Sequence, residues 1–167
     1  AWDGTGLGTD GTVWGGEFLV CTRAEFRRAA WLRPFLLVGG DAAAREPRRA
    51  ALGVLREMAS AHPPPGFTPA ELAVLDGMLR QGLNVVRTSS AGRLFDAAAS
   101  LLGVCQVMAH EGQAAMHLEA LAERGAAEPY PFGWRGDELD WAPLIAALLA
   151  GGAPPAVAAA RFHETLA

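Results

Sequence analysis

Glycine is concentrated at the start of the chain, which limits what the first 20 residues can form. Six glycines lie between Trp2 and Val20, among Trp, Val, Thr and Phe residues. Each glycine inside a helix costs about 1 kcal/mol relative to alanine, so a helix is disfavoured here. Asp10-Gly11 suits a hairpin turn, because both residue types tolerate positive backbone dihedral angles. We therefore expect residues 1–20 to form a glycine-rich β element with a turn at 9–12.

The remainder of the chain has the spacing of helices. Thr68-Pro69-Ala70-Glu71 combines an N-cap threonine, a proline in the first turn and a glutamate that completes a capping box. Ser89 or Ser90 can cap another helix. The sequence predicts that residues 42–167 are mainly helical. The expected helices, about six in number, cover 47–61, 68–82, 90–103, 112–123, a stretch opened by Asp140, and 155–166, while 133–137 is a loop.

This order of elements predicts an α/β fold, of α+β type within the segment. The chain has 167 residues, of which 51% are hydrophobic and 19% charged, so it forms a compact domain or part of one. A short sheet edge followed by many helices makes a poor closed two-layer domain. The chain also begins at Ala1 rather than at methionine. We therefore expect residues 1–167 to be a single internal segment of a longer polypeptide.

Composition excludes several classes of function. The net charge of -4 gives no basic field for nucleic acid. All 14 basic residues are arginine, so a Schiff-base lysine and a lysine phosphate loop are both absent. Apolar runs are interrupted well before the length of about 18 residues that a membrane span needs, so we expect no membrane association. Cys21 and Cys105 form no C-x-x-C pair, which favours a reduced, cytoplasmic protein.

The first candidate binding segment is Asp3-Gly4-Thr5-Gly6, at the expected junction of a strand and a turn. Glycine lets the backbone approach a phosphate, threonine donates a hydrogen bond, and aspartate can hold a metal-bound water or a ribose. A plain hairpin explains the same residues, because no third glycine follows at the spacing of a dinucleotide-binding loop.

The second candidate is an anion site made by Gly39, Gly40, Asp41 and Arg45. Two glycines precede a possible N-cap aspartate, and arginines follow at once. Amide N–H groups at a helix start together with arginines bind anions. A solvated helix start with Arg45 facing water is an equally good interpretation.

The third candidate joins two helix starts. Gly92, Arg93 and Asp96 open one helix, and Glu111 and Gly112 open the next. Hydroxyls and glycine at a helix N-terminus suit phosphate or ribose, but they also suit simple capping, and Arg93 with Asp96 also fits a weak surface ion pair. The four histidines show no metal-ligand spacing, so we expect no metal site within this chain.

Taken together, these motifs resemble the C-terminal region of the hydrogenase maturation carbamoyltransferases, the HypF family. The similar stretches occur in the same order along nearly the whole chain: residues 3–18, 39–41 with 45–47, 87–96 and 111–115. The resemblance implies part of an actin-like ATPase-type lobe. It also implies transfer of a carbamoyl group from carbamoyl-adenylate, made from carbamoyl phosphate and ATP, to a C-terminal cysteine of a HypE-like maturation protein, for the cyanide ligands of [NiFe] hydrogenase.

The same resemblance assigns roles to the candidate residues. It places Asp3, Gly4, Thr5 and Gly6 on a phosphate-facing hairpin. The nucleotide-lining helix would carry Gly92, Arg93 and Asp96, and Glu111 with Gly112 would lie near ribose or adenine. The full-length protein would also hold a divalent metal ion and zinc, whose family motifs this chain lacks.

The absence of the family's metal and zinc motifs predicts what the isolated chain cannot do, and two other functions are alternatives. Because the chain lacks these motifs, we expect no cofactor in the isolated chain and no transfer activity from it. In the full-length enzyme we expect replacement of Arg93 or Asp96 to weaken transfer more than folding. Two alternatives are a non-catalytic helical module that binds a partner, and an O-carbamoyltransferase acting on a small-molecule hydroxyl.

Overall fold

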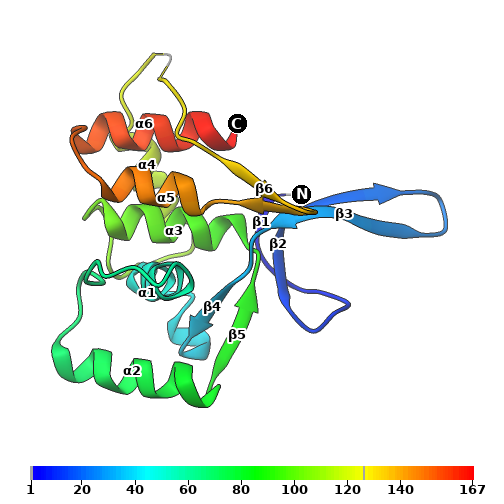
Figure 1. Cartoon of the computed structure of the whole chain (residues 1–167), viewed down its shortest axis with the longest axis horizontal. Coiled ribbons are helices and arrows are strands. Elements are labelled where there is room, and N and C mark those ends of the chain that lie inside the picture. The colour runs from blue at the N-terminus through cyan, green and yellow to red at the C-terminus, as the bar shows by residue number, and fades with distance from the viewer. Residues whose placement is uncertain (1, 126) are drawn as a thin grey trace.

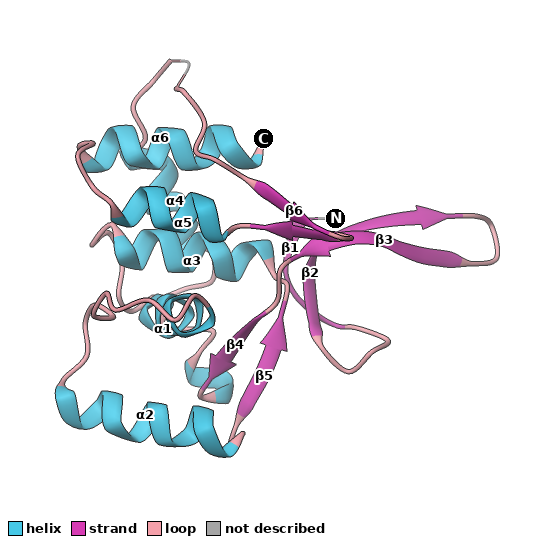
Figure 2. Ribbon diagram, in the orientation of Figure 1, coloured by secondary structure: helices cyan, strands magenta, loops and turns pink. Residues whose placement is uncertain are grey.

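The molecule divides into a strand region and a helical region (Figure 1). This computed structural model describes residues 2–125 and 127–167, with side chains from residue 5 onward. The strands of the described part are β1 (Trp2–Leu7), β2 (Val13–Cys21), β3 (Phe26–Leu32), β4 (Phe35–Val38), β5 (Val85–Thr88), β6 (Gly133–Arg135) and β7 (Glu138–Asp140). The helices are α1 (Pro47–Glu57), α2 (Pro69–Gln81), α3 (Ala91–Leu101), α4 (Gln113–Leu121), α5 (Ala142–Leu149) and α6 (Pro155–Leu166). They gather on one side of the strands (Figure 2).

The glycine-rich start forms the predicted hairpin. β1 and β2 pair antiparallel, with Gly6 opposite Trp14 and Leu7 opposite Val13. In the turn, Gly8 N–H donates to the Thr12 carbonyl at 2.8 Å, and Gly11 has a φ of +78°. The Asp10 carboxylate accepts from the Thr12 N–H at 3.0 Å. The prediction of a turn at residues 9–12 is therefore confirmed.

Strand β2 is the centre of the sheet. Its first half pairs with β1 and, in parallel, with β5, where Val13 lies opposite Thr88. From Glu17 onward it pairs antiparallel with β3, and this pairing contains a bulge between Phe18 and Leu19. The strand order is β4-β5-β2-β3-β7-β6, with β1 beside β2. The outer end of the β2–β3 ribbon projects away from the helices (Figure 1).

The structure confirms the helix starts that the sequence predicts for α2 and α3. Thr68 and Glu71 form a complete capping box at the start of α2, which ends at Gly82 with a φ of +65°. Of the two serines predicted as caps for α3, Ser90 is the one used, and its side chain accepts from the Arg93 N–H at 3.1 Å. Helices α1 and α4 are shorter than expected and end at Glu57 and Leu121.

The sheet is larger than the sequence predicts. Strands β3 and β4 lie in a region to which sequence reasoning assigned no element. The loop predicted at 133–137 is wrong, because Gly133–Arg135 forms β6, and Gly136, with a φ of +63°, turns it back onto β7. Asp140 ends β7, and α5 begins two residues later at Ala142, whose N–H donates to the Asp140 carboxylate at 3.0 Å.

The core lies between the sheet and the helices. Phe35 of β4 packs edge-on against Trp141 with ring centroids 5.8 Å apart, and the Trp141 indole N–H donates to the Arg33 carbonyl at 2.5 Å. Val54 of α1 and Leu94 of α3 are fully buried in the same cluster. This core fixes α3 against α1 and the sheet, and so fixes the first turn of α3. No helix of the described chain is both long and apolar enough to cross a membrane.

Candidate functional site

A cavity of about 390 Å³ brings together residues from all three candidate segments. We call it the site cavity. β1 contributes Thr5, the segment before α1 contributes Arg45, α3 contributes Arg93, and the segment before α4 contributes Glu111. These residues are separated by up to about a hundred positions in sequence, so only the fold places them together. The remaining lining residues are Ala44, Met108, Ala109 and His110.

The first turn of α3 presents a buried guanidinium to this cavity. Ser90 caps the helix, and Arg93 sits one turn in, with only 6% of its surface exposed. Its Nε has no hydrogen-bond partner among the described residues. A buried, unpaired N–H donor is costly, so native proteins satisfy such groups or use them to bind a ligand. Arg93 is therefore equipped to donate to an anion in the cavity.

Asp96 lies beside Arg93 and is 1% exposed. Its Oδ2 is 3.0 Å from Arg93 Nη2, yet this oxygen has no aligned hydrogen-bond partner among the described residues. Burial raises the pKa of Asp96 to about 6, and the charge of Arg93 offsets only part of that rise. The interpretation as an exposed surface ion pair is wrong, because both side chains are buried. Asp96 is not among the residues that line the site cavity and is connected to it through Arg93. Carboxyl groups with strongly raised pKa values are frequent at functional sites.

Arg45 is the second cation of the site cavity. Its neighbours Arg48 and Arg49 are both engaged by the Glu46 carboxylate, at 2.8 and 3.0 Å. Burial raises the pKa of Glu46, but the hydrogen bonds from these two arginines outweigh it and lower the pKa. Arg45 itself is exposed and makes no ion pair within the described part of the chain. Its guanidinium is thus available to an incoming anion.

The segment before α4 supplies Met108, Ala109, His110 and Glu111 to the cavity lining. Met108 N–H donates to the Arg45 carbonyl at 2.7 Å, which ties this segment to the one before α1. Glu111 is exposed, and Gly112 follows as the N-cap of α4 with a φ of +74°. The Gln113 side chain accepts from the Ala109 N–H at 2.6 Å. Glu111 therefore places an acceptor-only carboxylate at the edge of a cavity whose other charges are positive.

Other predicted residues lie elsewhere. Gly39, Gly40 and Asp41 form the turn between β4 and α1, outside the cavity lining. Gly39 has a φ of +110°, its N–H donates to the Asn84 carbonyl at 2.9 Å, and a side chain there would collide with Arg49. The turn therefore has a structural reason to be glycine.

The remaining predicted residues lie in α3 and β1. Gly92 lies in the first turn of α3, and Gly6 is paired in β1 opposite Trp14. Gly4 belongs to β1, while the side chain of Asp3 lies outside what the structure describes.

Sequence reasoning gave no role to four of the lining residues, Ala44, Met108, Ala109 and His110. It assigned Glu111 to the site and not the adjacent His110. Among the described side chains, residues 5–125 and 127–167, no three His, Cys, Asp or Glu group closely enough to hold a metal ion. The described residues therefore offer no ligand set for the divalent metal or the zinc that the resemblance implies.

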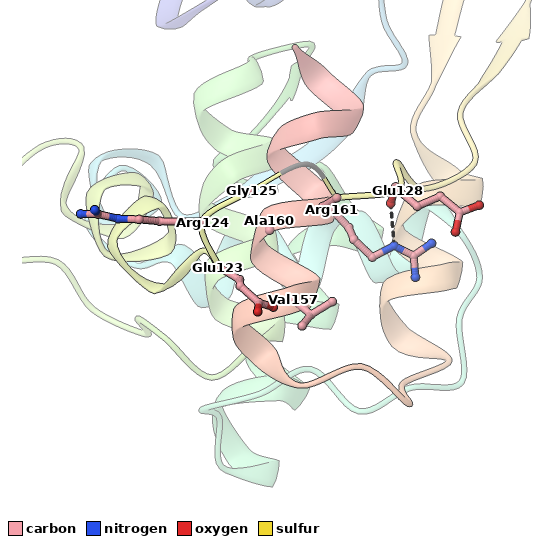
Figure 3. A pocket seen from close by; sticks show the side chains of 8 residues that line it. Glu123, Arg124, Gly125, Glu128, Val157, Ala160 and Arg161 are labelled. Carbon is pink, nitrogen blue, oxygen red and sulfur yellow. Dashed lines mark hydrogen bonds between the residues drawn. The ribbon is translucent and has the colours of Figure 1, made fainter.

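A second cavity, of about 420 Å³, lies between the end of α4 and α6 (Figure 3). Arg161 donates to the Glu128 carbonyl at 2.8 Å beside it, and its guanidinium stacks on Tyr130. The cavity contains none of the residues that the sequence singled out. The site cavity is therefore the candidate functional site.

Comparison with known proteins shows the family to which the chain belongs. The family model described as carbamoyltransferase, Kae1-like domain, second subdomain, matches residues 1–167. Carbamoyltransferase HypF of Rhodobacter capsulatus is 45% identical over 168 residues, which cover 99% of this chain and 22% of that protein. The chain belongs to the HypF carbamoyltransferase family. HypF of Rhizobium leguminosarum bv. viciae is 44% identical over 99% of this chain and 22% of that protein.

A solved HypF structure has the same fold. The crystal structure of full-length HypF in the phosphate- and nucleotide-bound form superposes with a TM-score of 0.87 and 33% identity. The match covers 99% of this chain and 23% of that one. The chain thus spans about a quarter of each of these HypF proteins. The family is that of a carbamoyltransferase, as the sequence predicts.

Proposed function

We propose that this chain supplies the adenylate-binding part of a HypF carbamoyltransferase, in which the site cavity holds the phosphate of carbamoyl-adenylate. The observation that carries the proposal is the convergence of Arg45 and Arg93 on one cavity, each with a donor that no carboxylate occupies. Guanidinium groups bind phosphate through parallel N–H donors. In a chain without lysine, they are the strongest anion ligands available.

The other lining residues have complementary tasks in this proposal. Thr5 adds a hydroxyl donor from β1, and Glu111 can accept from a ribose hydroxyl at the rim. During transfer, the thiolate of an acceptor cysteine attacks the carbamoyl carbon. The C–S bond forms, the bond from carbon to phosphate oxygen breaks, and AMP leaves with the electron pair. Arg93 and Arg45 favour this step because they stabilise the charge that grows on the phosphate.

The acceptor and the reaction partners follow from the family. We propose a HypE-like maturation protein as the acceptor, and carbamoyl phosphate and ATP as the substrates, in the cytoplasm. The divalent metal and zinc of the full-length enzyme would be held by residues outside the described part of this chain, and no step above depends on them. The support for nucleotide binding is that a solved HypF with the same fold is in a phosphate- and nucleotide-bound form.

Titration of the full-length enzyme that contains this chain with AMP tests the proposal, because two exposed arginines of the chain form a matched pair. Arg45 lines the cavity, whereas Arg23 lies at the tip of the β2–β3 ribbon, and neither makes an ion pair among the described residues. We expect Arg45→Ala to raise the Kd for AMP about tenfold, and Arg23→Ala to leave it nearly unchanged. Calorimetry measures both values.

Two results would count against the proposal. The first is the absence of AMP binding to the wild-type full-length enzyme, and the second is an equal loss in both arginine variants. Carbamoyl transfer to a HypE-like acceptor is a separate assay, in which we expect the isolated chain to be inactive. Transfer by the isolated chain would show that the motifs missing from it are dispensable.

A further inference from the structure

A buried carboxylate that takes no part in the proposed chemistry connects the sheet to the site. Glu17, in the middle of β2, is 4% exposed. Its Oε2 accepts from the Gly15 N–H at 2.6 Å and from the Gly16 N–H at 2.8 Å. Its Oε1 accepts from Arg28 Nη2 at 2.8 Å and from the Ser89 hydroxyl. Four donors from three parts of the chain thus converge on one side chain.

The Ser89 hydroxyl links this carboxylate to the start of α3. Ser89 is 1% exposed, and its N–H donates to the Val13 carbonyl of β2 at 3.0 Å. The next residue, Ser90, caps α3 by accepting from the Arg93 N–H at 3.1 Å. One continuous chain of bonds and contacts therefore runs from Glu17 through Ser89 and Ser90 to the backbone N–H of Arg93, whose guanidinium lines the site cavity.

Arg28, which donates to the Glu17 carboxylate, is itself held in place by several contacts. The Arg28 guanidinium lies 4.4 Å from the Trp14 ring centroid and 4.5 Å from that of Trp31, so two indoles hold it. It bonds Asp10 of the hairpin turn at 3.0 Å and also donates to the Ser89 hydroxyl at 3.0 Å. Arg28 and Glu17 together fix both hydrogen-bonding directions of Ser89.

The close approach of β2 to Ser89 leaves little freedom for another arrangement. Gly16 has no room for a Cβ, which would collide with the Ser89 carbonyl oxygen and the Leu32 side chain. Only a group with acceptors alone can satisfy four converging donors, and an ionised carboxylate is such a group. The residue type at position 17 is thus matched to its surroundings.

We infer that Glu17 is a positioning residue for the adenylate site: it holds Ser89, and through the N-cap Ser90 it fixes the first turn of α3 so that Arg93 faces the cavity. The inference deepens the proposed function, since it concerns the same site. Geometry set by such supporting contacts matters because small displacements of a binding group weaken its contacts with the ligand. No contact between Glu17 and the ligand is required.

Ser89→Ala tests this link with little risk to folding, and the chain offers a matched control. The Thr165 hydroxyl donates to the Arg161 carbonyl at 2.6 Å and accepts from the Tyr130 N–H at 2.7 Å, far from the site cavity. Thr165→Val removes one hydroxyl with one donated and one accepted bond, as Ser89→Ala does. A purely structural role predicts similar behaviour of the two variants.

The first readout needs no ligand. Arginine Nε–H signals in a ¹⁵N NMR spectrum report the surroundings of each guanidinium, and Arg93→Lys identifies the signal of Arg93 by its disappearance. We expect Ser89→Ala and Glu17→Gln to move or broaden this signal, although residue 17 is remote from Arg93 in sequence. Thr165→Val should leave it in place. An unmoved signal in a folded Ser89→Ala chain would overturn the inference.

The second readout is the affinity for AMP. We expect Ser89→Ala to raise the Kd about tenfold and Thr165→Val to change it by less than about twofold, at comparable losses of thermal stability. Equal changes in both variants would contradict the positioning role. These affinities are measured in the full-length enzyme. If the wild-type enzyme does not bind AMP, the proposed function fails, and the Nε–H signal alone decides whether Glu17 positions Arg93.

Discussion

Two arginine–aspartate ion pairs in this molecule have similar N–O distances but differ in their exposure to solvent. Arg93 and Asp96 lie 3.0 Å apart in the first turns of α3 and are both buried. Arg56 of α1 and Asp76 of α2 meet at 2.8 and 2.9 Å through two aligned hydrogen bonds, and both are partly exposed. The same two residue types thus form a buried, poorly bonded pair and a partly solvated, well-bonded one.

The pKa values of the two carboxyl groups move in opposite directions. Burial raises the pKa of Asp96 to about 6, despite the charge of Arg93. The hydrogen bonds from Arg56 lower the pKa of Asp76 by more than burial raises it. Desolvation therefore dominates in the first pair, and hydrogen bonding in the second.

This difference distinguishes an ion pair beside the candidate functional site from one that only joins two helices. The pair of Arg56 and Asp76 joins two helices and stabilises the fold slightly. The pair of Arg93 and Asp96 keeps an ionisable carboxyl group buried at a cost in stability, beside a cavity. Arrangements that lower stability are expected where function requires them. Variants of both pairs can test this contrast.

The largest effect is expected for Asp96→Asn, which removes the charge and keeps the shape. The pKa of Asp96 is about 6 in the folded chain, above its ordinary value of 3.8, so the folded state binds the proton more tightly than the unfolded state. The contribution of Asp96 to stability is therefore full below pH 4 and is lost as the pH rises through 6. We expect Asp96→Asn to raise the free energy of unfolding at pH 7 by up to about 3 kcal/mol.

The same variant at low pH is its own control. At pH 4 the native carboxyl group is already protonated, so the gain from Asp96→Asn should nearly disappear. Urea unfolding at several pH values between 4 and 7 measures the difference. A loss of stability at pH 7 would show that pairing with Arg93 outweighs burial, and the two pairs would then differ only in degree.

An intermediate effect of opposite sign is expected for Arg93→Met. This change removes the favourable charge next to Asp96 and leaves the carboxyl group buried, so its pKa should rise further above 6. We expect a loss of about 1–3 kcal/mol at pH 7, limited by protonation of Asp96. The carboxyl ¹³C signal of Asp96, followed by NMR against pH, checks the direction of the shift.

The double variant Arg93→Met, Asp96→Asn completes this test. Because the buried charge is gone, its stability should return to the wild-type value or exceed it. If the double variant is as unstable as Arg93→Met alone, the loss comes from packing around the guanidinium stem rather than from the unpaired carboxyl group.

Local signals in the sequence predicted local structure well. The hairpin turn around Asp10-Gly11 and the capping box of Thr68 with Glu71 depend on residues within a few positions of one another. Strands β3 to β7 were not predicted. The pairing of β3 with β7 joins distant segments: Trp31 lies opposite Glu138, and Leu32 opposite Leu139. Three-residue strands such as β6 and β7 have too few residues to show a two-residue alternation.

The sequence pointed to four of the eight residues that line the site cavity, and not to their geometry. The glycine and arginine motifs pointed to Thr5, Arg45, Arg93 and Glu111, all of which line one cavity. Sequence spacing gave no sign that Asp96 is buried, since an (i, i+3) pair on a helix surface looks the same in sequence. It also gave no sign of the link between Glu17 and Ser89, which depends on the pairing of β2 with the segment that follows β5.

The smallest effect is expected for Asp76→Asn, the counterpart of Asp96→Asn in the exposed pair. The folded-state pKa of Asp76 is lowered, so its stabilising contribution is present above its ordinary value of 3.8 and is lost as the pH falls. We expect a loss of about 0.2–1 kcal/mol at pH 7, which shrinks in high salt because solvent and ions screen the pair. Urea unfolding at low and high salt measures both values. A gain in stability here, as expected for Asp96→Asn, would mean that the hydrogen bonds to Arg56 do not outweigh desolvation, and the contrast between the two pairs would disappear.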